Sequence, residues 1–343
     1  MTADVIAVVL LLAVTAYTCA GGTDYGAGFW DLTAGGARRG QRPRWLIDHA
    51  MAPVWEVNNV WLIFVLVIMW TGFPVLFQTV FTALWLPLVL AVTGMVLRGA
   101  GFAFRKPSRR LAGRRLYGAA FASASVVTPF FLGAAVGGVA SGRASPGTEA
   151  SADAWSNPTS LVFGLVGVAT TAFLGAVFLT GDARRFDAPD LVAYFRRRAL
   201  GSLAVLTVLA VVTGFITHED SPHVWHGLSH GLGLFFVVLA GAAALATAWL
   251  AMRTPGVWVR VTAVGVVASA VLAWGMAQRP YLVPTSLTVA EAAGAPATLT
   301  WLVIVTLVAL VLVVPAVVLL YWLDTHGELA ELTDAELRRS EPR

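Results

Sequence analysis

The chain has 343 residues, of which 58% are apolar and only 12% are charged, and its mean hydropathy is +0.76. Soluble proteins carry about 25% charged residues, so half that share leaves too little polar surface to cover a chain of this size in water. These values exclude a soluble protein and indicate one that is embedded in a bilayer. The net charge of +4 is informative only through the places where the basic residues lie.

Nine apolar stretches are each long enough to form a membrane-spanning helix, which takes about 20 residues. We therefore expect an all-α, polytopic membrane protein. The first stretch is expected to be retained, because Met1–Asp4 contain no basic residue and do contain an acid. The Gly72-Phe73-Pro74 region between the second and third stretches predicts either a sharp re-entry or a short outer loop. The expected spans are 4–21, 57–73, 77–97, 117–140, 159–180, 200–217, 230–252, 259–277 and 299–323.

The basic residues support this number of spans independently. With the N-terminus outside, 21 of the 23 Lys and Arg residues fall in inner segments, and only Arg143 and Arg279 fall outside. One missed span would exchange the sides of everything after it and destroy this asymmetry. We therefore expect the N-terminus out and the C-terminus in. Nucleic acid is excluded as a partner, since topology alone explains the basic residues.

The chain shows no sign of a soluble domain. We expect a single transmembrane helical domain over residues 1–323 and a cytoplasmic polar tail over residues 324–343. The Ser-, Gly- and Pro-rich outer segment 141–158 is typical of a mobile connection. Two prolines, Pro280 and Pro284, predict a rigid non-helical stretch before the last span.

Two acids stand at the ends of apolar stretches. Asp24 follows the first expected span in a glycine-rich inner segment, and Glu56 opens the second span. Such an acid is costly unless it faces protein, water or a partner charge, so both are candidates for carrying protons. The alternatives are a solvated carboxylate for Asp24 and an interfacial carboxylate paired with Arg42 or Arg44 for Glu56.

Cysteine and histidine usage indicates that this chain binds no heme or metal by itself. The only cysteine, Cys19, excludes a multi-thiolate site. No histidine falls in the middle of an expected span, where a heme buried in a helical bundle would take its axial ligands. His226 and His230 are spaced for a divalent metal, but a polar outer loop is favoured. Catalytic triads, paired hydrolytic carboxylates and zinc-protease spacings are also absent from the sequence.

Four short segments, spread from the first expected span to the last, carry recognisable motifs. They are Gly22-Thr23-Asp24-Tyr25-Gly26-Ala27-Gly28, Pro53-Val54-Trp55-Glu56-Val57-Asn58 with Val60-Trp61-Leu62-Ile63, Leu97-Arg98-Gly99 to Phe104-Arg105, and Pro280-Tyr281 to Ser286-Leu287-Thr288. In this order and spacing they resemble subunit II of the cytochrome bd-type quinol oxidases. The second segment is the specific one, whereas the glycine motif alone is weak.

The resemblance implies nine helices in two four-helix bundles plus one peripheral helix, in the bacterial cytoplasmic membrane. It also implies a heme-bearing partner, subunit I, which holds hemes b and d (or a b-type variant), oxidises quinol and reduces dioxygen to water. This chain would then bind no cofactor and hold no catalytic residue, and it would support assembly of the complex. Quinone and lipid are further expected partners, and a small extra subunit is left open.

The resemblance also assigns roles to individual residues. Glu56 and Asp24 match acids that line a proton path from the cytoplasm toward the oxygen-reducing heme. Residues expected to shape the path or anchor its cytoplasmic side are Trp55, Asn58, Trp61 and Arg98.

Ala103 stands where family members commonly carry an acid, which leaves the completeness of the path undecided.

Two alternatives to this function stay open. A secondary transporter would use Glu56 and Asp24 as ion-coupling carboxylates, although the sequence shows no inverted repeat. The chain could also be a purely structural assembly subunit.

Overall fold

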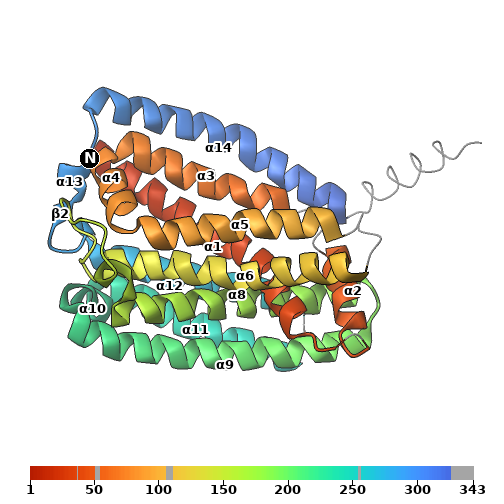
Figure 1. Cartoon of the computed structure of the whole chain (residues 1–343). Coiled ribbons are helices and arrows are strands. Elements are labelled where there is room, and N and C mark those ends of the chain that lie inside the picture. The colour runs from red at the N-terminus through yellow and green to blue at the C-terminus, as the bar shows by residue number, and fades with distance from the viewer. Residues whose placement is uncertain (37, 51–54, 106–110, 254–255, 326–343) are drawn as a thin grey trace, which may run out of the picture.

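The computed structural model describes residues 1–36, 38–50, 55–105, 111–253 and 256–325. Long helices lie side by side and run the length of the molecule (Figure 1). Their bounds are α1 (Thr2–Thr33), α3 (Trp55–Gly72), α5 (Trp85–Arg105), α6 (Leu111–Ala140), α8 (Pro158–Arg185), α9 (Pro189–Asp220), α11 (Gly231–Arg253), α12 (Val257–Gln278) and α14 (Pro296–Thr325). Shorter helices connect them: α2 (Gln41–Ala50), α4 (Pro74–Ala83), α7 (Asp153–Ser156), α10 (Pro222–Ser229) and α13 (Val289–Ala292).

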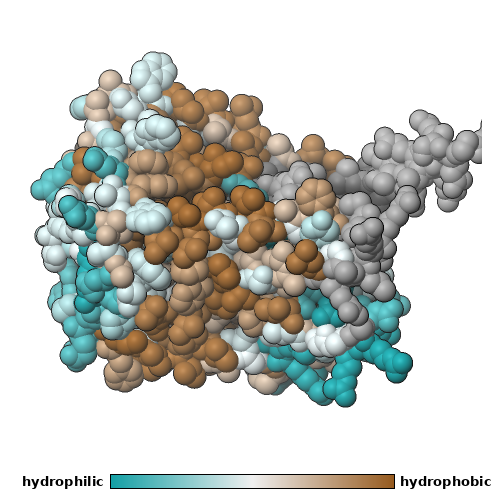
Figure 2. All heavy atoms as spheres, viewed as in Figure 1, coloured by the Kyte–Doolittle hydropathy of each residue, from teal (hydrophilic) through white to brown (hydrophobic). Residues whose placement is uncertain are grey.

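The long helices match the expected membrane spans. Within the described residues, eight helices are long and apolar enough to cross a membrane, and α3 with α4 makes a ninth candidate that is bent by 117°. On the face shown in Figure 2, apolar side chains form a band across the middle of the molecule, and hydrophilic side chains gather toward its two ends. The predicted all-α, polytopic membrane fold is therefore confirmed.

The boundaries of the third expected span, 77–97, were wrong. The structure places this span at α5, which begins at Trp85, and makes a separate short helix, α4, from the residues before it. Pro74 is the first residue of α4, and the residue before a proline is disfavoured in helical geometry. Phe73 accordingly leaves helical geometry, with φ −134° and ψ 66°, and the chain bends there between α3 and α4.

The first expected span, 4–21, was too short. Helix α1 continues without interruption to Thr33, so the glycine-rich segment lies inside the bundle and not in an inner loop. Glycine lowers helix propensity by about 1 kcal/mol per residue relative to alanine. Close packing against other helices, described below, compensates for this loss.

The spans form two groups of four, with α14 outside them. Helices α1, α3, α5 and α6 pack together, and α8, α9, α11 and α12 surround a second buried core. Helix α1 also packs against α8 and α12, so it joins the two groups. Helix α14 contacts α1 and α3 and exposes most of its remaining apolar side chains. This is the predicted arrangement of two four-helix bundles plus one peripheral helix.

The ends of the bundle carry the remaining elements. The stretch from Pro280 to Thr288 forms a small antiparallel hairpin, β1 (Tyr281–Val283) with β2 (Leu287–Thr288), which confirms that it is not helical. The N-terminus and the end of α14 lie at opposite ends of the bundle (Figure 1). Which end faces the cytoplasm stays a prediction, and the expected polar tail falls almost entirely outside the described residues.

Candidate functional site

An ion pair is buried inside the first bundle. The Arg98 guanidinium on α5 lies 2.7 Å from the Asp24 Oδ1 on α1, and the two residues are only 5% and 8% exposed. A charge buried in an apolar bundle is tolerated when a partner charge and hydrogen bonds compensate its lost hydration. Asp24 is therefore not the solvated carboxylate at a helix end that its position in the sequence allowed.

Among the described residues, the Arg98 guanidinium contacts groups of α1 and α6. It donates to the Asp24 backbone carbonyl at 3.1 Å and, through Nε, to the Ser125 hydroxyl of α6 at 3.2 Å. Its Cζ atom lies 4.8 Å from the ring centroid of Tyr25 and 5.1 Å from that of Phe121. Such cation–π contacts stabilise a desolvated guanidinium further. Arg98 thus ties α1, α5 and α6 together around one charged centre.

Two glycines of α1 allow this centre to form. A Cβ atom on Gly26 would overlap the Thr171 carbonyl oxygen of α8, and one on Gly28 would overlap the Ser125 hydroxyl. Only glycine lets α1 approach α8 and α6 this closely. The glycine motif is therefore a packing surface of a continuous helix, and it brings Asp24 to Arg98.

Of the other residues expected along the proton path, the structure describes the side chain of Trp61 but not those of the first turn of α3. Trp55, Glu56 and Asn58 belong to the first turn of α3, and their side chains lie outside the described part of the chain. Trp61, one to two turns further on, is half-buried and packs edge-on to Phe64 with 6.5 Å between ring centroids. Their roles in a proton path stay predictions.

Arg42 and Arg44, the two residues considered as partners of Glu56, bind other acids. Arg42 lies 2.9 Å from Asp190, and Arg44 lies 2.8 Å from Asp31. Ala103 is exposed on α5, so the missing acid at this position leaves no gap within the described core.

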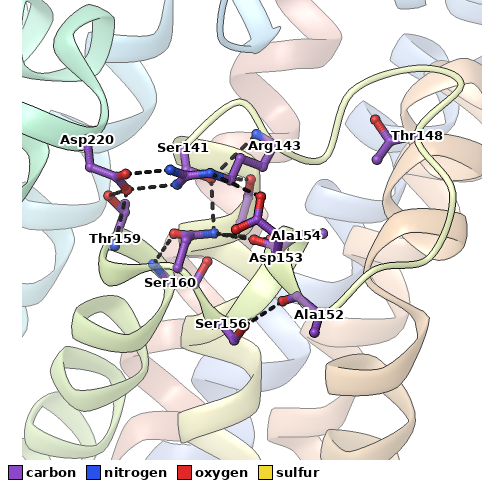
Figure 3. Close-up of polar contacts among 12 residues, drawn as sticks. Ser141, Arg143, Thr148, Ala152, Asp153, Ala154, Ser156, Thr159, Ser160 and Asp220 are labelled. Carbon is purple, nitrogen blue, oxygen red and sulfur yellow. Dashed lines mark hydrogen bonds and ion pairs between the residues drawn. The ribbon is translucent and has the colours of Figure 1, made fainter.

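A second polar cluster joins the loop 141–157 to the end of α9 (Figure 3). Arg143 donates to both carboxylate oxygens of Asp220, at 2.9 and 2.7 Å, and Asp220 also accepts from the Thr159 hydroxyl. Hydrogen bonding to this carboxylate raises the pKa of Arg143 above its ordinary value. Within the loop, the Asn157 side chain accepts from the backbone N–H of Ser160 and so caps α8. The loop expected to be a mobile connection is therefore held by specific contacts.

The substitution Arg143→Gln is expected to destabilise the protein by about 1–3 kcal/mol, because it leaves a mostly buried carboxylate without its charged partner. Asp220 is 13% exposed and Arg143 is 32% exposed in this pair. The control is Arg279→Gln, which removes a pair with Asp4 that is half-exposed and 3.6 Å apart. Exposed pairs contribute about 0–1 kcal/mol. The midpoint of thermal unfolding in detergent measures both variants, and equal shifts would contradict a structural role of the Arg143–Asp220 pair.

The described histidines offer no site for a heme in the bundle. His49 lies in the last turn of α2, His218 lies in the last turn of α9, and the histidines from 223 to 230 lie in or next to α10. His226 and His230 stack with 4.4 Å between ring centroids, but among the described residues no group of three potential ligands could hold a metal ion. These positions do not suit axial ligands of a buried heme. That this chain binds no heme or metal stays a prediction.

Fold and site together define a multi-pass helical membrane protein with a charged centre inside its first bundle. The sequence matches the family model of cytochrome bd terminal oxidase subunit II over residues 2–324, and the chain belongs to this family. With its apolar helices, this makes it a multi-pass protein of a bacterial cytoplasmic membrane.

Individual relatives are distant in sequence. Cytochrome bd-I ubiquinol oxidase subunit 2 of Escherichia coli strain K12 is 25% identical over 260 residues, which are 72% of this chain and 65% of that protein. The proteins of the same name in E. coli O6:H1 and O157:H7 match with the same values. The match thus spans slightly less than two thirds of these curated relatives. A chain in the structure of bd oxidase from Geobacillus thermodenitrificans has the same fold, with a TM-score of 0.76 and 24% identity over 94% of this chain and 98% of that chain.

Proposed function

We propose that this chain is the heme-free subunit II of a bd-type quinol:dioxygen oxidoreductase. In this function it supports assembly of a heme-bearing subunit I and delivers protons from the cytoplasm for the reduction of dioxygen to water. Membership of the subunit II family supports the place in the complex. The E. coli relatives are, by name, subunits of a ubiquinol oxidase.

The buried Asp24–Arg98 pair is the observation that carries the proton role. An ionisable residue inside a transmembrane bundle marks a proton or ion pathway by default, because its burial is costly. Asp24 lies about 14 Å along α1 from the helix end at Thr33, at 1.5 Å per residue. It is therefore well inside the span, on the side that the arginine distribution assigns to the cytoplasm.

Glu56 is the second acid of the proposed path. It belongs to the first turn of α3, which packs against α1. With the arginine-rich end of the bundle toward the cytoplasm, a proton reaches Glu56 first and Asp24 next. Heme and quinol chemistry takes place in the partner, and the residues of this chain only hold and transfer protons.

The substitution Glu56→Gln tests this role. We expect quinol-dependent oxygen consumption to fall by roughly a hundredfold or more, as for loss of a proton-transferring side chain, while the complex keeps its hemes. The matched control is Asp190→Asn, which neutralises an exposed acid that pairs with Arg42 near the inner end of α9. Oxygen uptake and heme content are measured on the same purified complex.

The other outcomes separate the alternative functions. Normal turnover in the Glu56→Gln complex would make Glu56 an interfacial carboxylate and contradict its role in proton delivery. Loss of the hemes would favour a purely structural assembly subunit. A transporter would instead be recognised by proton-coupled solute uptake of the chain without any heme-bearing partner.

A further inference from the structure

A proton that reaches Asp24 still has to leave this chain. The proposed function places the oxygen-reducing heme in a partner, whereas Asp24 is buried among α1, α5 and α6. A complete path therefore needs polar groups that lead from the ion pair to the surface of the chain within the membrane. Two tyrosine hydroxyls on α1 meet this need.

The first group, Tyr25, adjoins the ion pair directly. Its ring lies under the Arg98 guanidinium, 4.8 Å from Cζ to the ring centroid, and the residue is 4% exposed. Because Arg98 contacts both Tyr25 and the Asp24 carboxylate, it fixes the phenol next to the acid. The position of Tyr25 is thus set by the same centre that holds Asp24.

The second group, Tyr17, connects Tyr25 to the surface. Its hydroxyl lies 3.5 Å from the Tyr25 hydroxyl, although the two residues are about two helical turns apart. The missing side chain of Gly21 leaves room for the Tyr17 ring, since a Cβ atom there would lie 3.3 Å from it, which is a tight contact. Tyr17 is partly exposed, unlike Tyr25. The pair therefore connects the buried Tyr25 to a residue that is partly exposed at the surface of the bundle.

We infer that the Tyr25 and Tyr17 hydroxyls continue the proton path from Asp24 to the partner subunit. This inference rests on the proposed function. A phenol is both a donor and an acceptor of hydrogen bonds. Each hydroxyl takes a proton on its oxygen and releases its own hydrogen to the next acceptor, so the charge of neither tyrosine changes overall. Both hydroxyls lie between the positions of Tyr17 and Tyr25 on α1, where the Tyr17 ring passes over Gly21.

The test removes single oxygen atoms. Tyr17→Phe and Tyr25→Phe keep the aromatic rings and their packing but delete the hydroxyls. We expect each variant to lower kcat for quinol-dependent oxygen reduction by roughly tenfold or more, with unchanged KM for quinol and unchanged heme content. The matched control is Tyr194→Phe on α9, because the Tyr194 hydroxyl is buried and makes no hydrogen bond to any described residue. Its kcat is expected to equal that of the unmodified complex.

Glu56→Gln is measured in parallel so that the two hypotheses can fail separately. If Glu56→Gln is slow and both tyrosine variants turn over normally, the tyrosine relay is wrong and the proposed function stands. If all three turn over normally, proton delivery through this chain is wrong as well. Should Tyr25→Phe fail to assemble, Tyr17→Phe decides, since Tyr17 is the less buried of the two. Loss of hemes in Tyr17→Phe would show a structural role and overturn the relay.

Discussion

The substitution Arg98→Leu is expected to prevent accumulation of a folded, heme-containing complex. It leaves the Asp24 carboxylate buried without the guanidinium that lies 2.7 Å away in the native chain. Removal of one partner of a buried ion pair costs about 3–5 kcal/mol, which is a large part of the stability of a typical protein. The amount of complex that copurifies with a tag on this chain measures the effect.

A double variant separates the charge effect from the loss of packing. Asp24→Leu together with Arg98→Leu removes both charges, and replacement of a buried pair by apolar residues is often neutral or stabilising. Ser125 stays satisfied, because its hydroxyl already donates to the Phe121 carbonyl. We therefore expect the double variant to recover assembly but to turn over slowly. Arg42→Leu, at an exposed pair, is the control. Normal assembly of Arg98→Leu would contradict the compensating role of this ion pair.

The substitution Gly26→Ala is expected to separate α1 from α8. Its Cβ atom would overlap the Thr171 carbonyl oxygen and would lie 2.7 Å from the Gly175 Cα, and neither backbone atom can move aside as a side chain does. Overpacking in a well-packed core costs about 1–3 kcal/mol or more, and here whole helices must shift. The shift also moves Asp24 away from Arg98, so we expect both the thermal midpoint and the turnover to fall.

Gly201→Ala is the matched control for this effect. Gly201 lies in helix α9, and a Cβ atom there would meet nothing within 4 Å. Where the space is open, alanine in a helix is more stable than glycine by roughly 0.5–1 kcal/mol. A Gly26→Ala complex that is as stable as the Gly201→Ala complex would refute the close approach of α1 and α8.

The spans were predictable because each must satisfy a local requirement. Every stretch needs enough apolar residues to cross the membrane, and arginines mark its inner end, so composition within a short window carries the information. The continuation of α1 to Thr33 was not predictable in this way. Its glycines are poor helix formers, and what stabilises them is contact with residues such as Thr171 and Leu174, far away in the sequence.

In the candidate site, too, single residues were predictable from the sequence, whereas the contacts between them were not. Asp24 and Arg98 were both identified by family motifs, but their pairing depends on how α1 crosses α5, which no local pattern encodes. The contact between the Tyr17 and Tyr25 hydroxyls was not predicted. The spacing of Tyr17, Gly21 and Tyr25 at successive intervals of four places all three on one helix face, and this signal could have been noticed. The contact between Arg143 and Asp220 joins a loop that was expected to be mobile to the end of α9.

The most direct test of the account is a reduced-minus-oxidised difference spectrum of the material that copurifies with a tag on this chain, recorded together with quinol-dependent oxygen consumption. We predict the bands of b-type and d-type (or a second b-type) heme, active oxygen reduction, and no heme signal when this chain is expressed without its partner. A heme spectrum from the chain alone would contradict the account. Purification of the native chain free of any heme protein, with no oxidase activity, would contradict it as well.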